Sequence, residues 1–413
     1  MSSSRSTNTV VIGGGHSGLA MSSRLSARGI DHVVLEKGEV AASWRKQRWD
    51  SFTLLTPNWQ TCLPGLAYGG DEPDGFMTGS EIVEFIDRYA REIDAPVLSN
   101  TAVSAVRAAG GAYEVESDQG PWRCRSVVLA GGACNLPSIP DFAVGLPDGI
   151  ESVNPLDYRN PEQLPDGGVL IVGAAATGIQ LADEIQRSGR QVTISIGEHV
   201  RMPRTHRGRD IQFWMDAIGR LDERYDEVEE VLKARKVASP QLIGTPERRT
   251  LDLNSLVDDG VHLRGRLGAI RDGVAMFSGG LRNHCALADQ KLGRLLGDID
   301  DWITARGLDG EVGPPEEFEP TRVAAGAPLT LDLRCGEIRS VIWATGFRPD
   351  LSWVDLPVFD AGGRLRHDGG VVDAPGVYFL GGTFLRRRRS SFIHGAADDT
   401  RDLADHLVHY LAG

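Results

Sequence analysis

Glycines recur with one spacing in two short stretches of this chain. The first stretch, VVIGGGHSGLAM, places Gly13, Gly15 and Gly18 in the pattern G-x-G-x-x-G. The first glycine of such a pattern permits a tight turn, the second lets the backbone approach a pyrophosphate, and the third lets a helix pack closely on a strand. The free N–H groups and the dipole of a helix that begins here attract phosphates. These residues therefore favour the binding of a dinucleotide.

The segments around the first stretch support this interpretation. A short β-branched strand at 9–12 precedes the glycines, helical spacing follows over 17–27, and the strand HVVLEK ends in Glu36 and Lys37. A carboxylate at this place accepts hydrogen bonds from ribose hydroxyls and repels a 2′-phosphate. We therefore expect both residues to contact FAD or NAD rather than NADP. The alternative is a glycine-rich turn without a ligand, because the pattern alone is weak.

The second stretch, VLIVGAAATGIQ, keeps Gly173 and Gly178 but has Ala175 in the middle. The strand before it, the helix that begins near Thr177 and the strand at 191–196 repeat the first unit. Decay of an old site would have eroded the helix and the second strand as well, and both are intact. The extra methyl group loosens the phosphate contact without filling the site. The stretch therefore predicts a second nucleotide site.

The second unit lacks a carboxylate at the end of its second strand. The sequence there, ISIGEHVRMPRTHRGRD, places Ser195 near the expected ribose position, with Arg201, Arg204 and Arg207 soon after it. A hydroxyl group and guanidinium groups suit a 2′-phosphate, through charge-assisted hydrogen bonds. The sequence therefore predicts NADPH at this site, with Ser195, Arg201 and Arg204 as contacts. The alternative for the arginines is a solvated surface loop.

A second internal repeat supports the two-site interpretation. RSVVLAGG at 125–132 and RSVIWATGF at 339–347 are both Arg-Ser followed by a β-branched strand that ends in small residues. Each brings a strand end near a dinucleotide, so Thr345 and Gly346 are candidates for cofactor contact. A repeated supersecondary unit explains both segments.

The predicted fold is α/β with two Rossmann-like dinucleotide-binding domains, which suits a chain of 413 residues. One copy of the Arg-Ser repeat precedes the second nucleotide stretch and the other follows it. The NADPH domain, 161–339, is therefore expected to be inserted into a discontinuous FAD domain made of 1–160 and 340–413. Residues of about 210–320 are expected to form a helical insertion within the NADPH domain.

Composition narrows the class of protein. Hydrophobic residues make up 41% of the chain and charged residues 24%, as is typical of soluble globular proteins. The net charge of -13 argues against a nucleic-acid partner. The five cysteines include no C-x-x-C pair, so neither a redox disulfide nor a metal site is expected. Neither a membrane span nor a signal peptide is indicated, so a cytoplasmic protein is expected, and a homodimer is left open.

Six segments of the chain resemble the class B flavin-dependent monooxygenases, a family that includes animal flavin monooxygenases and plant YUCCA-type enzymes. They are GGGHSG, ASWR with Trp44, LLTPNWQTCLPG with Asn58, GAAATG, WATGFRPD and GVYFLGG with Gly381. The resemblance implies that NADPH reduces FAD and that a C4a-(hydro)peroxyflavin formed with O2 oxygenates a small molecule. The reaction would be N- or S-oxygenation or the oxidation of a 2-oxo acid. The resemblance also implies that Trp44 and Gly381 contact the flavin cofactor and that Asn58 is the active-site asparagine.

Two residues with implied roles have ordinary structural alternatives. Asn58 could instead cap a loop. His394 could lie by the pyrimidine edge of the flavin, with a helix-end or surface role as the alternative. In the family motif F-x-G-x-x-x-H-x-x-x-Y/W, Asn154 stands in the histidine place before Tyr158. That departure argues against a Baeyer–Villiger enzyme.

Other functions remain open from the sequence. The nearest alternative is an FAD-containing NADPH oxidase or reductase that oxygenates no substrate. An alternative of another class is a non-catalytic flavoprotein that binds a partner. A disulfide reductase is disfavoured because the sequence has no redox cysteine pair.

Overall fold

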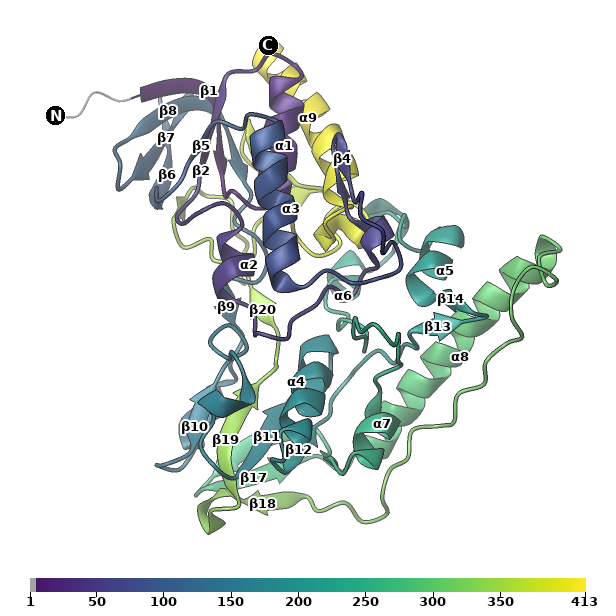
Figure 1. Cartoon of the computed structure of the whole chain (residues 1–413). Coiled ribbons are helices and arrows are strands. Elements are labelled where there is room, and N and C mark those ends of the chain that lie inside the picture. The colour runs from purple at the N-terminus through teal and green to yellow at the C-terminus, as the bar shows by residue number, and fades with distance from the viewer. Residues whose placement is uncertain (1–4) are drawn as a thin grey trace.

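In the computed structural model, which describes residues 5–413, the chain folds into two α/β units, one above the other in Figure 1. The upper unit contains a parallel sheet in which strands β24, β8, β1, β2 and β5 pair in that order. The lower unit contains a parallel sheet in the order β10, β19, β11, β12 and β15. Each strand of one sheet has a counterpart in the other. The predicted fold class is confirmed.

The strands of both sheets are buried apolar runs. β11 and β12 are buried along their whole length, as are the last four residues of β1. Helices cover both faces of a parallel sheet, which is why such strands lack alternation. The upper strands are β24 (Val377–Phe379), β8 (Trp122–Leu129), β1 (Arg5–Ile12), β2 (His32–Leu35) and β5 (Val97–Leu98). Their lower counterparts are β10 (Glu151–Val153), β19 (Ile338–Trp343), β11 (Gly168–Val172), β12 (Val192–Ser195) and β15 (His262–Arg264).

Antiparallel strands extend the repeat. In the upper unit a hairpin leads from β5 into β8, and in the lower unit a meander leads from β15 toward β19. The upper hairpin consists of β6 (Val103–Ala109) and β7 (Ala112–Ser117), with β21 (Val354–Asp355) on its edge. The meander consists of β16 (Leu267–Arg271), β17 (Val274–Phe277) and β18 (Thr330–Asp332). The duplication therefore includes more than the nucleotide stretches.

Helices occupy equivalent places in the two units. The first strand is followed by α1 in the upper unit and α4 in the lower, while α3 and α7 lie between the second strand and the outer one. A capping box starts α3, in which the Thr78 hydroxyl accepts from the N–H of Glu81 and the Glu81 carboxylate accepts from the N–H of Thr78. The C-terminal helix α9 packs on α1. These helices are α1 (His16–Ser26), α3 (Gly79–Glu92), α4 (Ala176–Arg187), α7 (Leu253–Asp258) and α9 (Ala396–Ala412).

The boundaries between the two units differ from those predicted. β10 and β19 both belong to the lower sheet, so the lower unit starts before residue 161 and ends after residue 339. The chain crosses between the units at β9 (Leu136–Pro137) and β20 (Phe347–Arg348), which pair with each other. The discontinuous upper unit therefore comprises about 5–137 and 347–413, in place of the predicted 1–160 and 340–413. The sequence patterns marked the strands but not the sheet that each strand joins.

The expected helical insertion at 210–320 is also corrected. Strands β15, β16 and β17 lie within that range and belong to the lower unit. The helices of the range form separate pieces around them: α5 (Ile211–Ala217), α6 (Val231–Ala234), α7 and the long α8 (Leu281–Ala305). Within residues 5–413, no helix has both the length and the apolar character needed to span a bilayer.

One part of this range docks on the upper unit. The segment 221–225 runs antiparallel to 386–389, where Tyr225 N–H donates to the Arg386 carbonyl over 3.0 Å and Arg388 N–H donates to Glu223 over 3.1 Å. Ion pairs reinforce the backbone contact, because Arg388 pairs with Glu223 and Arg389 pairs with both Asp222 and Asp398. The arginine run therefore joins the two units. We call this contact the 221–225/386–389 clamp.

The third glycine of each nucleotide stretch sets how closely helix packs on strand. A Cβ on Gly18 would lie 1.9 Å from the Gly13 carbonyl oxygen, and a Cβ on Gly178 would lie 1.9 Å from the Gly173 oxygen. Real Cβ atoms do not approach backbone oxygens so closely. Only glycine therefore allows these helices to lie where they do.

We predict that Gly178→Ala lowers the midpoint of thermal unfolding, because the new methyl group must push α4 away from the sheet. The expected destabilisation is about 1–3 kcal/mol. Gly293→Ala in α8 is the matched control, since no atom lies within 4 Å of its Cβ position. Alanine in an open helical position stabilises by about 0.4–1 kcal/mol. Equal midpoints for the two variants would contradict the packing argument.

Candidate functional site

The first nucleotide stretch has an open space in front of α1. Gly13 has a φ of +116°, and a Cβ there would lie 2.3 Å from the Ala130 carbonyl oxygen, so the turn requires glycine. Gly15 is the N-cap of α1, and no side chain caps the helix there. Nothing lies within 4 Å of a Cβ placed on Gly15. The uncapped N–H groups and the free space together fit a pyrophosphate.

Glu36 is fixed beside this space by backbone donors. Its carboxylate accepts from the Gly14 N–H over 2.6 Å and from the Gly38 N–H over 2.9 Å, and the side chain is buried. Each oxygen has a second lone pair, which can accept from a ribose hydroxyl. Lys37, the next residue, is exposed. The structure thus holds the Glu36 carboxylate where the first unit needs it, and leaves Lys37 at the rim.

Gly381 and Trp44 both lie near the first turn of α1. Gly381 has a φ of +75° at the end of β24, and a Cβ there would lie 3.3 Å from the Ser17 hydroxyl. Trp44, on α2 (Ala42–Lys46), has its ring centre 6.4 Å from that of His16 and 6.0 Å from that of Phe52. Burial lowers the pKa of His16 to about 4, so its imidazole is neutral at pH 7. The surroundings of the helix start are therefore aromatic, with the Arg48 guanidinium 4.9 Å from the centre of the Trp44 ring.

Asn58 lies in a turn that buries polar atoms without satisfying them. Its Nδ2 donates to the Glu72 carbonyl over 2.9 Å, while its Oδ1 is buried without a hydrogen-bond partner. The two polar atoms of the Gln60 side chain and the Thr61 hydroxyl are also buried and unpaired. These residues belong to or follow the short turn η1 (Asn58–Gln60). Buried polar groups are rarely left unpaired, so this turn fits the polar edge of a bound cofactor or substrate.

The second nucleotide stretch copies the geometry of the first. Gly173 has a φ of +112°, and a Cβ there would lie 2.3 Å from the Ala344 carbonyl oxygen. Ala175 is the N-cap of α4 with φ -78° and ψ -176°, close to the -84° and -179° of Gly15. An alanine adopts these angles without strain. Thr177 lies half-buried in the first turn of α4. The substitution at Ala175 therefore preserves the backbone of the site.

The prediction for Ser195 is corrected. The Gly13 N–H donates to Leu35 and the Gly173 N–H donates to Ser195, so Ser195 is the counterpart of Leu35. The Ser195 hydroxyl donates to the Gly265 carbonyl over 3.1 Å and accepts from the Leu267 N–H over 2.9 Å. It is buried and joins two strands. The counterpart of Glu36 is the next residue, Ile196, which confirms only that no carboxylate occupies the position.

The predictions for Arg201 and Arg204 are also corrected. Arg201 is buried and pairs with Asp252 and Asp289, both at 2.7 Å. Arg204 has no exposed surface and pairs with Asp210 at 2.6 Å. Guanidinium groups held between internal carboxylates are not available to a coenzyme phosphate. These two arginines are therefore neither phosphate contacts, as predicted, nor part of a solvated surface loop, which was the alternative. They form internal ion pairs.

Two other arginines lie at the carboxyl edge of the lower sheet. Arg264 is paired in register with Ser195 on the neighbouring strand. Arg266, two residues further on, is exposed, and its Cδ lies 3.5 Å from a Cβ placed on Gly197, two residues after the end of β12. Among the described residues neither arginine pairs with a carboxylate, and the Arg264 Nε is buried without a partner. Both cations therefore lie near the end of β12, where Ile196 occupies the place that Glu36 has in the first unit.

Thr345 and Gly346 follow the end of β19. The Ala344 carbonyl contacts the Gly173 turn, as Ala130 contacts Gly13 in the first unit. Thr345 donates its hydroxyl hydrogen to the Ser138 carbonyl over 2.6 Å, and Gly346 has a φ of +94° just before the crossing strand β20. The two residues therefore lie between the lower nucleotide turn and the crossing to the upper unit.

Asn154, in the histidine place of the family motif, caps a turn by accepting from the Leu156 N–H over 3.0 Å.

Burial disfavours the charged forms of four thiols and of His394. All five cysteines lie within residues 5–413 and are free. Burial raises the pKa of the Cys62 and Cys134 thiols, and raises the pKa of Cys124 to about 12. A thiol with a raised pKa is a poor nucleophile at pH 7. Burial lowers the pKa of His394 to about 4, and its Nε2 is buried without a partner.

Sequence reasoning missed Ile196, Gln60, Thr61 and the Arg264–Arg266 pair. The position of Ile196 was available from the sequence, because it lies as many residues after Gly173 as Glu36 lies after Gly13. The arginine pair had no signal, since Arg264 and Arg266 reach the end of β12 only through the parallel pairing of β12 with β15. Gln60 and Thr61 carry no signal either, because only burial distinguishes them from other polar loop residues.

Comparison with known proteins identifies relatives. The family model for pyridine nucleotide-disulphide oxidoreductases matches residues 10–249. An uncharacterised CzcO-like oxidoreductase from Geobacillus kaustophilus is 28% identical over 98% of this chain and 99% of its own length. The indole-3-pyruvate monooxygenase YUCCA1 of Oryza sativa subsp. japonica is 30% identical over 45% of this chain and 47% of its own. The resemblance to flavin-dependent monooxygenases is thereby confirmed.

A solved structure has the same fold. A mutant flavin monooxygenase from Stenotrophomonas maltophilia superposes with a TM-score of 0.67 and 20% identity, over 98% of this chain and 99% of that one. At this identity the likeness describes the fold alone. It covers both units together, including the β9–β20 crossing.

We predict that Gly15→Glu abolishes retention of FAD, because a carboxylate there would face the pyrophosphate position. Gly15→Ala is the matched control, since a methyl group meets no atom within 4 Å and the backbone angles suit alanine. The measurement is the flavin absorbance per mole of purified protein, with circular dichroism to verify folding. A Gly15→Glu protein that stays yellow at wild-type stoichiometry would contradict the assignment.

Proposed function

Because the chain belongs to the pyridine nucleotide-disulphide oxidoreductase family, we propose that it is an FAD- and NADPH-dependent monooxygenase that uses O2 to oxygenate a small molecule. The chain is a flavin-dependent oxidoreductase, and its flavin monooxygenase relatives support the narrower activity. The observation that carries the proposal is the exact structural repeat of two dinucleotide turns on two joined sheets. One turn has a carboxylate for a ribose, and the other has none.

The two cofactors fit different units. In the upper unit the Gly15 turn would hold the FAD pyrophosphate, Glu36 its ribose, and Gly381 would allow close approach at the start of α1. In the lower unit the turn from Gly173 to Ala175 would hold the pyrophosphate of NADPH. FAD, when bound and reduced by NADPH, supplies the chemistry that activates O2. The protein supplies position and shelter.

The properties of the cysteines favour oxygen over a disulfide as the acceptor of electrons from the reduced flavin. Disulfide exchange needs a thiolate and a partner thiol. The cysteines within residues 5–413 are free, and burial raises the pKa of Cys62 and Cys134. The aromatic rings of Trp44 and Phe52 and the buried, neutral His16 suit a site that excludes water from a reactive oxygen species.

The polar turn at Asn58 gives the chain's own contribution to the reaction. The unpaired Oδ1 of Asn58 can accept a hydrogen bond from a nicotinamide amide or from a flavin N–H, and its Nδ2 is held in place by the Glu72 carbonyl. Gln60 and Thr61 add donors and acceptors beside it. We assign Asn58 to orienting the bound nicotinamide or flavin. This orientation would prolong the transient that follows mixing of the reduced enzyme with O2.

We predict that NADPH-reduced enzyme mixed with O2 in a stopped-flow instrument shows an absorbance transient distinct from both the reduced and the oxidised flavin. Asn58→Ala should shorten its lifetime, because the orienting amide is lost. Asn283→Ala, exposed on α8, is the control and should leave the lifetime unchanged. Direct return of the wild-type enzyme to oxidised flavin, with NADP⁺ present, would contradict the monooxygenase and favour an oxidase that releases peroxide.

A second prediction tests the coenzyme. Arg266→Ala should raise the KM for NADPH and leave that for NADH nearly unchanged, because Arg266 lies exposed beside the end of β12 and among the described residues pairs with no carboxylate. One lost charge-assisted contact costs about 1.5–3 kcal/mol, or roughly tenfold to a hundredfold in KM. Arg201→Ala is the control: it breaks internal ion pairs and should lower stability while affecting both coenzymes alike. Selectivity lost with Arg201 and kept with Arg266 would restore the original assignment.

A further inference from the structure

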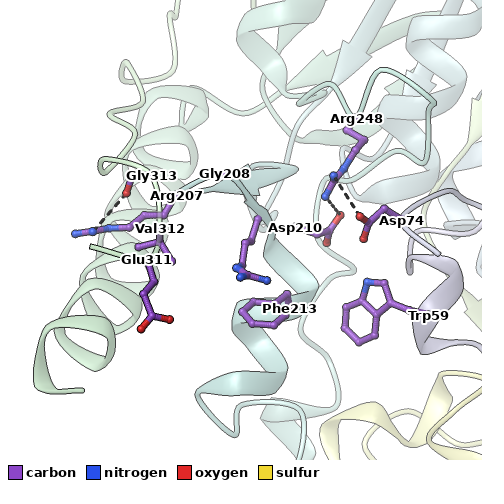
Figure 2. Close-up of a pocket in the computed structure, with 11 residues that line it drawn as sticks. Trp59, Asp74, Arg207, Gly208, Asp210, Phe213, Arg248, Glu311, Val312 and Gly313 are labelled. Atoms are coloured by element: carbon purple, nitrogen blue, oxygen red, sulfur yellow. Dashed lines mark hydrogen bonds and ion pairs between the residues drawn. The ribbon is translucent and has the colours of Figure 1, made fainter. Parts of the chain in front are cut away.

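A cavity of about 360 Å³ lies beside the Asn58 turn, between the two units. Its walls come from the turn after Asn58, the hairpin of β13 (Thr205–His206) and β14 (Arg209–Asp210), and helix α5. Figure 2 shows Trp59 and Phe213 in the lower part of the view and Arg248 above them, reaching toward Asp74 and Asp210. The volume is within the range of small-molecule sites.

Aromatic rings form the apolar part of the cavity. Trp59 is 36% exposed, an unusual position for a large ring, and it directly follows Asn58. Phe213, on α5, is half-buried, and the Arg209 guanidinium lies 4.6 Å from its ring centre. A flat apolar group could therefore lie against two rings that the protein leaves partly uncovered.

Within residues 5–413, two arginines of the cavity are not held in a short ion pair and can therefore bind an anionic ligand. Arg207 is already paired with Asp300 and Asp309, and Asp210 is already paired with Arg204 at 2.6 Å. The remaining cations are Arg209 and Arg248.

These two arginines are weakly engaged. Among the described residues Arg209 has no carboxylate partner. Arg248 reaches Asp74 and Asp210 only at 4.0 and 3.9 Å, and its Nε is buried without a hydrogen bond. A planar guanidinium with free donors suits a carboxylate.

Backbone strain gathers at the same place. Arg207 has a φ of +49° and Arg248 a φ of +53°, the left-handed region that favours glycine. Non-glycine residues held in this region cluster at functional sites. Arg207 is tied down by its two carboxylates and by the Gly313 carbonyl, so the hairpin that carries Arg209 is rigid.

We propose that this cavity binds the substrate and that the substrate is an organic monocarboxylate with a flat apolar body. Its carboxylate contacts Arg209 and Arg248, and its body lies between Trp59 and Phe213, which places it beside the Asn58 turn. Asp74 and Glu311 also line the cavity, and their charges disfavour a dianion such as a phosphate ester. The identity of the ligand as substrate rests on the proposed function; its binding does not.

The test is isothermal titration calorimetry of the oxidised, FAD-loaded enzyme with (phenylthio)acetate and its neutral analogue (phenylthio)acetamide. We expect the acetate to bind about tenfold more tightly than the amide, as one charge-assisted contact implies. Arg209→Gln should remove this preference, and Trp59→Ala should weaken both probes alike. Arg306→Gln is the matched control, because Arg306 also lies over a ring, 4.0 Å from the centre of Trp302, but outside the cavity.

Several outcomes would overturn the proposal. They are no binding of the acetate, equal binding of acetate and amide by the wild-type enzyme, or a preference that survives Arg209→Gln. Loss of the preference in Arg306→Gln as well would also overturn it, since the effect would then not be local. The titration uses neither NADPH nor O2, so failure here and failure of the flavin to react with oxygen as proposed are separate results.

Discussion

The close approach of α1 and of α4 to the glycine turn that precedes each helix is the constraint on which this structure depends. Where α1 leaves the Gly13 turn and α4 leaves the Gly173 turn, the third glycine lies so near the first carbonyl that any side chain would collide with it. That closeness places the uncapped helix start directly at the carboxyl edge of the sheet. A dinucleotide site needs this edge free of side chains, and both units achieve it with the same contacts, down to the alanine carbonyl of the neighbouring strand.

Two nucleotide sites are useful to an oxidoreductase only if they stay in a fixed relation. The chain crosses between its units at the short β9–β20 ladder. The 221–225/386–389 clamp adds a second connection, in which backbone hydrogen bonds are reinforced by Arg388 and Arg389. Single exposed ion pairs contribute little, but backbone pairing together with a network of partly buried charges restrains both position and rotation.

The arginines show how similar residues take different roles in an acidic chain. Arg201 and Arg204 are adjacent in sequence to the second nucleotide unit, yet each neutralises internal carboxylates. Among the described residues neither Arg209 nor Arg266 has a carboxylate partner; Arg209 lines the cavity beside Trp59, and Arg266 is exposed. A buried charge without a partner is strongly unfavourable, so the internal Arg201 and Arg204 require carboxylate partners. The arginines that remain unpaired are the ones with capacity for a ligand.

By itself the sequence determined the number and kind of nucleotide units, the residues of each glycine turn, the Glu36 carboxylate and the discontinuous order of the chain. These features depend on local backbone chemistry, on glycine conformation and strand periodicity, which a short window of sequence contains. Tertiary structure decided which sheet β10 and β19 join, that the Ser195 hydroxyl is held between the Gly265 carbonyl and the Leu267 N–H, and that Arg201 and Arg204 are internal. It also decided which polar atoms around Asn58 are buried unpaired. Those outcomes depend on strand register and on which charges meet across long separations, and no local pattern encodes either.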